Sequence, residues 1–123
     1  MLIIESNAVS ALLPYPKGIS VNKVWRLGKK GIYLNPSVKK YKADVYLILA
    51  NTQSFEDAPV EVNLKIYPPD YRVRDIDNVL KVILDALQFA KIINNDSQIK
   101  RLVIEKMGVI PNGRVEIRIE SLA

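Results

Sequence analysis

The chain has 123 residues, of which 49% are apolar and 25% charged, with a formal net charge of +5 and neither cysteine nor histidine. This length and composition predict a single domain over residues 1–123, because a chain of this size buries enough apolar surface to fold without disulfides. The missing residue types exclude thiolate nucleophiles, Cys/His zinc sites and histidine general bases. Any chemistry must therefore use carboxylates, hydroxyls, lysine, arginine and a metal bound through oxygen.

No apolar run approaches the roughly 18 residues that a membrane span requires. The opening stretch "MLIIESNAVS" lacks the basic start and the long apolar core of a signal peptide. We therefore expect a soluble cytoplasmic protein that does not interact with membranes.

Positive charge is concentrated in the first third of the chain. Residues 1–42 contain eight lysines and arginines against Glu5 alone, whereas the remainder contains ten cations against twelve anions. A one-sided positive field attracts polyanions such as nucleic acids. Lysines that only improve solubility would produce the same pattern, so the charge alone leaves both interpretations open.

The first half of the chain predicts a strand, a basic loop and a helix. Residues 9–16 read as a strand that ends at prolines, and 18–36 as a glycine-punctuated loop with a short strand at "GIYL". Asn35 and Pro36 are typical of a helix start. Apolar residues at helical spacing extend that helix to about residue 51.

The second half predicts a strand, a helix and two further strands. Apolar and polar residues alternate over 60–67, and an amphipathic helix covers 76–91. After the loop "INNDSQ", strands at 99–109 and 114–121 are joined by an Asn-Gly turn, which favours a C-terminal hairpin. The fold class is therefore α+β, with two main helices and a mixed or antiparallel sheet.

The stretch "YPPDYRVRDIDNVLKVILDALQ" places Asp75 and Asp77 at the start of the second helix, directly after Arg72 and Arg74. In a structural interpretation, one aspartate caps the helix and Asp77 pairs with Lys81, which contributes about 0.2–0.5 kcal/mol. In a metal-site interpretation, both carboxylates are needed. Two carboxylates about 5 Å apart repel by roughly 3 kcal/mol at an effective dielectric constant near 20, and a divalent cation reverses the sign of that term.

A third carboxylate, Asp96, follows this helix in "INNDSQ". A helix of about 15 residues is about 22 Å long, so Asp96 joins the first two aspartates only if the chain folds back. The structural alternative is a turn aspartate that hydrogen-bonds to its own backbone.

Together these motifs resemble the RusA family of Holliday-junction resolvases, small endonucleases that are often encoded by prophages. The resemblance is strongest over residues 67–106, where "D-I-D-N-V-L-K", "D-A-L" and "D-S-Q" follow one another, and extends more weakly into "LPYPKGISVNKVWR". It implies that Asp75, Asp77 and Asp96 bind the metal and that Lys81 is a further catalytic residue. The residues expected to contact DNA are basic or amide side chains: Lys23, Arg26, Lys29, Lys30, Arg72, Arg74 and Asn78.

The resemblance also implies the activity. A member of this family would be a magnesium-dependent enzyme that resolves four-way DNA junctions by paired symmetric nicks in recombination and repair. Manganese would substitute for magnesium. It implies a homodimer, because two-fold symmetry presents two matching sites to such a junction, and branched DNA rather than a small molecule as substrate. We would expect such a protein in the cytoplasm of a bacterium, including one that carries a phage or prophage.

One departure from the family concerns the last loop. The family often has two adjacent acids there, whereas this chain has Asn95 before Asp96. If the first of those acids helps to hold a second metal ion, that ligand is missing here.

Other interpretations remain open at this stage. Trp25, Tyr33 and Tyr15 could stack on unpaired bases or pack in the core. The chain could be a non-catalytic basic nucleic-acid-binding module whose carboxylates only cap helices. It could also be a homodimeric structural protein without a nucleic-acid partner.

Overall fold

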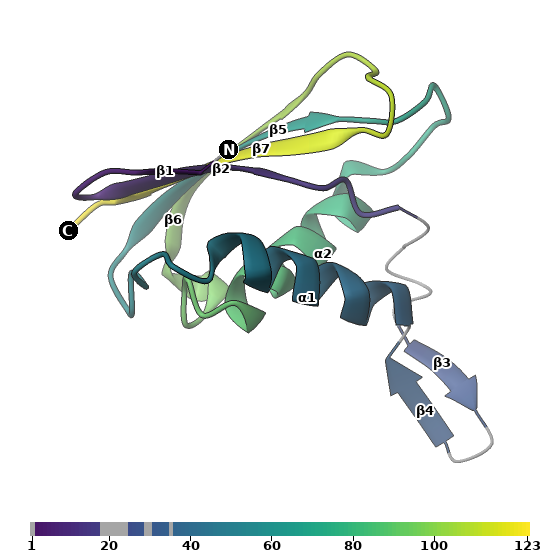
Figure 1. Ribbon diagram of the computed structural model, residues 1–123, viewed down its shortest axis with the longest axis horizontal. Coiled ribbons are helices and arrows are strands. Elements are labelled where there is room, and N and C mark those ends of the chain that lie inside the picture. The colour runs from purple at the N-terminus through teal and green to yellow at the C-terminus, as the bar shows by residue number, and fades with distance from the viewer. Residues whose placement is uncertain (1, 18–24, 29–30, 35) are drawn as a thin grey trace.

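The computed structural model describes residues 2–17, 25–28, 31–34 and 36–123, with side chains for all of these except 25–28 and 31–34. Two helices cover one face of a five-stranded sheet, and a two-stranded hairpin stands apart (Figure 1). Within the described residues, no helix is long and apolar enough to cross a membrane. The elements in chain order are β1 (Leu2–Ile4), β2 (Ala8–Leu13), β3 (Trp25–Gly28), β4 (Gly31–Leu34), α1 (Pro36–Leu49), β5 (Val60–Tyr67), α2 (Ile76–Phe89), the 3-10 turn η2 (Asp96–Gln98), β6 (Ile99–Lys106) and β7 (Arg114–Ser121).

The large sheet is mixed, with strand order β1-β2-β7-β5-β6. β5 pairs in parallel with β6 and antiparallel with β7, and β2 and β1 continue the sheet antiparallel. The hairpin of β3 and β4 contains the predicted short strand at "GIYL". The α+β fold with two main helices and a mixed sheet is therefore confirmed.

The predicted C-terminal hairpin is wrong, because β6 and β7 lie on opposite sides of β5. α2 connects β5 to β6 as a crossover, which makes β6 the parallel neighbour of β5 and leaves the other side to β7. The turn itself is present: Gly113 N–H donates to the Ile110 carbonyl at 3.0 Å, and Asn112 has φ 67°. An Asn-Gly turn therefore reverses the chain here without pairing the two strands that it joins.

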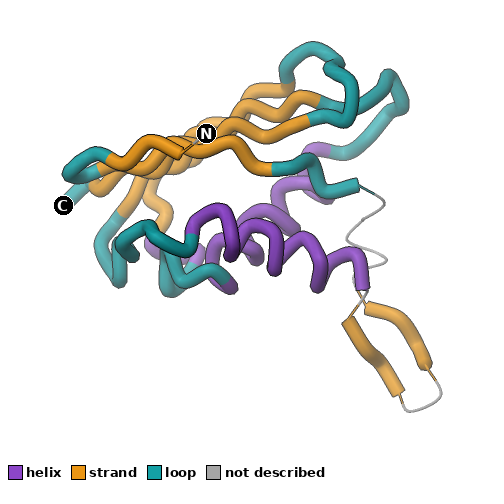
Figure 2. Tube along the Cα trace, viewed as in Figure 1, coloured by secondary structure: helices purple, strands orange, loops and turns teal. Residues whose placement is uncertain are grey.

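The core lies between the helices and the sheet (Figure 2). Alternate residues of β2, β5 and β7 point toward the helices, and the apolar stripe of each helix packs on them, as the two periodicities require. The Tyr41 hydroxyl of α1 donates to the Pro14 carbonyl at 2.8 Å, which satisfies the polar end of a buried ring. The buried residues of the helices are Val38, Tyr41, Val45, Leu49, Val79, Val82, Ile83, Ala86 and Leu87.

The opposite face of the sheet is polar, and its charges neutralise one another. Arg101 contacts Glu61 at 3.4 Å, and Arg118 contacts Glu5 at 2.8 Å. Arg114 lies 3.8 Å from a glutamate on its own strand. Because these arginines already contact carboxylates, this face offers a phosphate backbone little free positive charge.

Both helices begin where the sequence predicts and end two residues early, at Leu49 and Phe89. α2 ends because Lys91 adopts a left-handed conformation with φ 60°, which a continuing helix does not accommodate. Hydrophobic periodicity does not report such a local backbone change.

The strands at 60–67 and 114–121 are confirmed residue for residue, because clear alternation defines both ends. β2 ends at Leu13 and β6 at Lys106, three residues before their predicted ends. β1 was not predicted, since three residues are too few for alternation to be visible.

We expect Gly113→Ala to lower the free energy of unfolding by about 2–4 kcal/mol. Gly113 has φ +66°, and a Cβ there would lie 2.8 Å from both the Tyr15 Cβ and the Tyr67 carbonyl oxygen. Gly108→Ala is the matched control, because a Cβ at that position meets nothing within 4 Å. Urea unfolding of the two variants measures the difference, and equal stability would contradict the close approach at residue 113.

Candidate active site

The first two predicted ligands lie at the start of α2 with free carboxylates. Asp75 occupies the N-cap position in an extended conformation (φ −76°, ψ 131°), but its side chain makes no capping hydrogen bond. Asp77 lies in the first turn and is exposed. Among the described residues, neither carboxylate has a hydrogen bond or an ion pair. Asp75 therefore occupies the N-cap position, but its side chain does not cap the helix.

Lys81 does not form the ion pair predicted from helical spacing. Its Nζ lies 3.1 Å from Asp85 Oδ1, one turn toward the C-terminus, rather than beside Asp77. Asp77 lies near the positive end of the helix dipole, which stabilises a carboxylate without a lysine. The Lys81 side chain is 56% exposed, and such exposed pairs stabilise a helix only weakly. Lys81 therefore remains accessible one turn away from Asp77.

The loop before α2 is organised by Asp70, which the sequence analysis did not single out. Its Oδ1 accepts the Arg72 backbone N–H at 2.9 Å and lies 2.7 Å from Arg74 Nη1. The hydrogen bond from Arg74, followed by that from the Arg72 backbone, holds the pKa of the Asp70 carboxyl well below its usual range. The only signal in the sequence is an aspartate after two prolines, a common start of a turn.

Arg74 is held against the body of the protein. Its guanidinium lies 5.7 Å from the centre of the Tyr15 ring, and its Nη1 also donates to the carbonyls of Asp70 and Arg72. Tyr15 is only 6% exposed, and burial raises the pKa of its hydroxyl. The alternative in which Tyr15 stacks on bases is therefore wrong, and this ring belongs to the core. The Arg72 side chain, by contrast, is 81% exposed.

Asp96 lies at the other end of α2. Its backbone N–H donates to Gln88 Oε1 at 2.7 Å, and Gln88 follows Asp77 by about 16 Å along the helix axis. Accordingly, the described residues contain no group of three carboxylates that could hold a metal ion within one chain. The fold-back that would bring Asp96 to Asp75 and Asp77 does not occur within a single copy.

Asn95, where the family often has an acid, has a structural role in this turn. Its Oδ1 accepts the Ser97 backbone N–H at 2.8 Å and caps η2. An aspartate would offer the same acceptor. The local backbone hydrogen bond considered for Asp96 is thus made by Asn95, and the Asp96 side chain is exposed.

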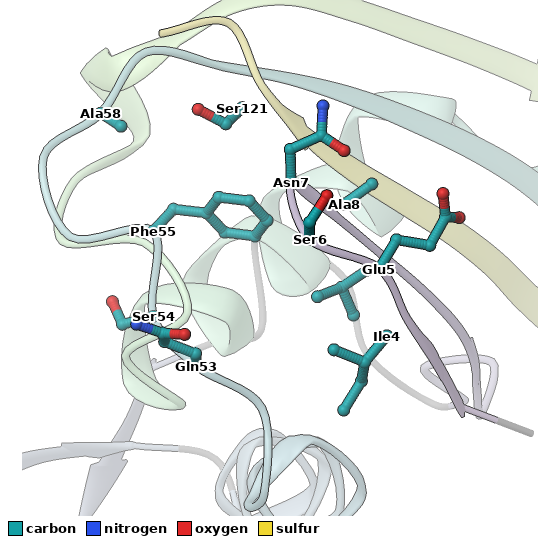
Figure 3. A pocket seen from close by; sticks show the side chains of 11 residues that line it. Ile4, Glu5, Ser6, Asn7, Ala8, Gln53, Ser54, Phe55, Ala58 and Ser121 are labelled. Atoms are coloured by element: carbon teal, nitrogen blue, oxygen red, sulfur yellow. The ribbon is translucent and has the colours of Figure 1, made fainter.

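A cavity of about 260 Å³ lies between the β1–β2 turn and the segment before β5. Figure 3 shows the Phe55 ring facing Ser6 and Asn7 across it. The one acid in its lining, Glu5, is already paired with Arg118. With a single neutralised carboxylate, this cavity does not have the ligand set of a metal site.

Comparison with known proteins identifies the family. A family described as "Endodeoxyribonuclease RusA" matches residues 14–120. The chain belongs to the RusA family of endodeoxyribonucleases. The crossover junction endodeoxyribonuclease of Enterobacteria phage HK97 is 31% identical over 118 residues, which cover 94% of this chain and 97% of that protein. The Escherichia coli K12 enzyme of the same name is 30% identical with the same coverage.

Membership in the RusA family confirms the resemblance inferred from the motifs, and the matched range contains Asp75, Asp77, Lys81 and Asp96. Among solved structures, the periplasmic domain of Helicobacter pylori MotB is similar at a TM-score of 0.46 and 16% identity, covering 99% of this chain and 79% of that one. That value is too low to bear on function.

Part of the predicted DNA-binding set cannot be placed. Lys23, Lys29 and Lys30 lie outside the described residues, and Arg26 is described only through the backbone of β3. Trp25 in β3 and Tyr33 in β4, the two other candidate stacking aromatics, are likewise described only through their backbone.

We expect Asp70→Asn to destabilise the protein at neutral pH but not in acid. In the folded protein the Asp70 pKa is lowered, so its stabilising contribution is present above the unfolded pKa of about 4 and is lost as the pH falls through the folded pKa. Urea unfolding of wild type and variant should show a difference that narrows below about pH 4. Asp44→Asn, which removes an exposed i,i+4 pair with Lys40, is the control. A difference that persists unchanged in acid would contradict the role of the Asp70 charge.

Proposed function

We propose that this chain is a divalent-metal-dependent endonuclease that cuts four-way DNA junctions, with Asp75, Asp77 and Asp96 as metal ligands and Lys81 as a further catalytic residue. One observation carries the proposal: two exposed carboxylates, with no partner among the residues that the structure describes, lie at the start of α2 in a chain of an endodeoxyribonuclease family. The relatives named above are crossover junction enzymes. A purely structural role as a helix cap does not explain the pair, because Asp75 makes no capping hydrogen bond.

The donor chemistry fits a hard cation. With neither cysteine nor histidine in the chain, only oxygen ligands are available, which is the set that Mg²⁺ and Mn²⁺ prefer. When bound, such an ion supplies Lewis acidity toward the scissile phosphate and lowers the pKa of water. Asp75 and Asp77 would hold it at the positive end of α2, where helix N–H groups also favour a phosphate.

Lys81 is placed to stabilise charge that develops on the phosphate. It lies one helical turn beyond Asp77, so both side chains lie on the same stripe of α2. Its ammonium would donate to a phosphate oxygen as negative charge grows during in-line attack. The carboxylate of Asp85, 3.1 Å from Lys81 Nζ, forms only an exposed ion pair, which a phosphate oxygen would replace at little cost.

The third ligand requires a second copy of the chain. Asp77, Lys81 and Gln88 follow one stripe of α2, and Asp96 lies at the far end of that stripe. If two copies pack these stripes antiparallel about a two-fold axis, Asp96 of each copy lies beside Asp75 and Asp77 of the other. A homodimer would thus complete two equivalent sites, which matches the two symmetric cuts that resolve a four-way junction.

The DNA would approach the helical side of the dimer, because the open face of the sheet is neutralised by its own ion pairs. Arg72 is exposed there and Asn78 is half-buried next to Asp77. The basic residues of the first third, including Lys23, Arg26, Lys29 and Lys30, would follow the backbones of the junction arms. Such a substrate places the protein in the cytoplasm of a bacterium, including one that is infected by a phage or carries a prophage.

We expect Asp75→Asn to reduce magnesium-dependent nicking of a four-way junction by more than about 100-fold, since even outer partners of metal ligands cost 10–100-fold. Binding of the junction should persist or tighten, because the variant loses a negative charge that repels phosphate. Gel assays of cleavage and of binding test both points. Asp44→Asn on α1 is the control and should cleave like wild type. Wild-type cleavage by Asp75→Asn would end the catalytic assignment.

A mixing experiment tests the shared site. Asp75→Asn and Asp96→Asn homodimers should each be inactive, but a mixed dimer keeps one site in which all three carboxylates are intact. Random exchange of subunits should therefore restore about a quarter of wild-type nicking. If the mixture stays as inactive as its components, the three ligands come from one subunit and the proposed arrangement is wrong.

A further inference from the structure

Gln98 is the one buried polar or charged residue among those that the structure describes, and it is 8% exposed. Its Oε1 accepts the backbone N–H groups of Asn94 at 2.8 Å and Asn95 at 3.0 Å. Its Nε2 donates to the carbonyls of Glu56 and Ala58, each at 2.8 Å. Every donor and both acceptor positions of the amide are therefore used.

This amide ties together the two segments that lead into the parallel strands. Residues 56–58 precede β5, and residues 94–98 precede β6. A buried amide gains little net stability over an apolar side chain, but a fully satisfied one specifies a single geometry. Gln98 therefore fixes the turn that contains Asp96 relative to the sheet.

The turn is unusual because four consecutive backbone N–H groups bond to side-chain oxygens. Those of Asn94 and Asn95 bond to Gln98, that of Asp96 to Gln88, and that of Ser97 to Asn95. The bonds of Asp96 and Ser97 are exposed, so water would satisfy these two N–H groups without any side chain. These two bonds therefore select a backbone position more than they compensate for burial.

Gln88 adds the link to the helix. Its Oε1 accepts the Asp96 N–H at 2.7 Å, so the backbone of Asp96 is bonded to α2 through Gln88, and the two residues before it are held by Gln98. The carboxylate of Asp96 itself has no partner among the described residues and is exposed. This arrangement fixes the backbone position of Asp96 and leaves both carboxylate oxygens available for a ligand.

We propose that Gln88 and Gln98 are positioning residues that fix Asp96 for metal binding. The proposal rests on the proposed function, in which Asp96 is a ligand. It adds two residues that do not touch the metal or the DNA and that act by orienting a ligand, as outer partners of metal ligands do.

Gln88→Met gives the cleanest test, because Gln88 is half-buried on the helix surface and methionine has nearly the same size without the acceptor. We expect Mn²⁺ affinity, measured by electron paramagnetic resonance of the free ion, to fall about 10-fold or more. The melting temperature, the junction affinity and the dimer mass in solution should stay at wild-type values, because Gln88 lies on the α2 stripe proposed to pack between the two copies. Hydrogen exchange should show a faster Asp96 amide, and Gln88→Glu, which restores an acceptor, should restore both Mn²⁺ affinity and amide protection.

Gln98→Glu tests the second positioning residue. It keeps the acceptor oxygen but places a second oxygen against the carbonyls of Glu56 and Ala58, so we expect weaker Mn²⁺ binding with faster exchange at residues 94–96. Because this variant is also expected to be less stable, the decision rests on Gln88→Met. Lys100→Met is the matched control: it removes a contact to the Ser97 carbonyl in the same turn and should not weaken Mn²⁺ binding.

Asp96→Asn separates failure of this proposal from failure of the proposed function. If Asp96→Asn weakens Mn²⁺ binding and Gln88→Met leaves it at the wild-type value, the positioning role is overturned and the metal assignment stands. If neither substitution affects Mn²⁺ binding, Asp96 is not a ligand and both fall.

Discussion

The parallel pairing of β5 with β6 is the constraint on which the rest of the structure depends. Parallel neighbours require a crossover from one end of the sheet to the other, and α2 supplies it. A crossover helix of 14 residues is about 21 Å long. The residues just before α2 and the turn just after it must therefore lie at opposite ends of the domain. The separation of Asp75 and Asp77 from Asp96 follows from this topology and not from any local feature of the loops.

The two ends of α2 are built in contrasting ways that serve the same purpose. At the N-terminal end, Asp70 forms an ion pair with Arg74, and Asp75 and Asp77 have no cationic partner in the part of the chain that the structure describes. At the C-terminal end, side-chain amides hold the backbone around Asp96. In both places neighbouring residues satisfy the local hydrogen-bonding groups, and the aspartates are left exposed with their charge available.

The sequence was most informative where a feature depends on neighbouring residues. The strands at 60–67 and 114–121 follow from alternation, and both helix starts follow from apolar spacing, with Pro36 at the first position of α1. The prediction of a C-terminal hairpin was wrong because an Asn-Gly turn indicates only that the chain reverses. Which strands pair depends on long-range packing, and here both β6 and β7 pair with β5. The predicted end of α2 was wrong because Lys91 adopts a left-handed backbone conformation, and no glycine in the sequence marks this change.

The candidate site shows the same division. Asp75, Asp77, Lys81 and Asp96 were predicted as site residues from the order of short motifs, which the sequence records directly. The sequence did not indicate the hydrogen bonds of Gln98, because they join distant segments: Gln98 bonds to residues 42 and 40 positions away. Polar residues in loops show no periodicity, so the sequence does not distinguish a buried hydrogen-bonding side chain from one in solvent.

A site that one copy cannot complete has a functional consequence. In the proposed dimer, each metal site takes carboxylates from both copies, so a lone subunit has two ligands at one end and the third about a helix length away. Such a subunit would hold a cation weakly, because two carboxylates leave most of the coordination positions of Mg²⁺ to water. Cleavage would then depend on dimerisation, and the two sites of a dimer would form together. A nuclease that must cut a junction twice, at symmetric positions, benefits from this coupling, since a single unpaired cut leaves the junction unresolved. The crossover topology that separates the aspartates within one chain would thereby link catalysis to the symmetry of the substrate.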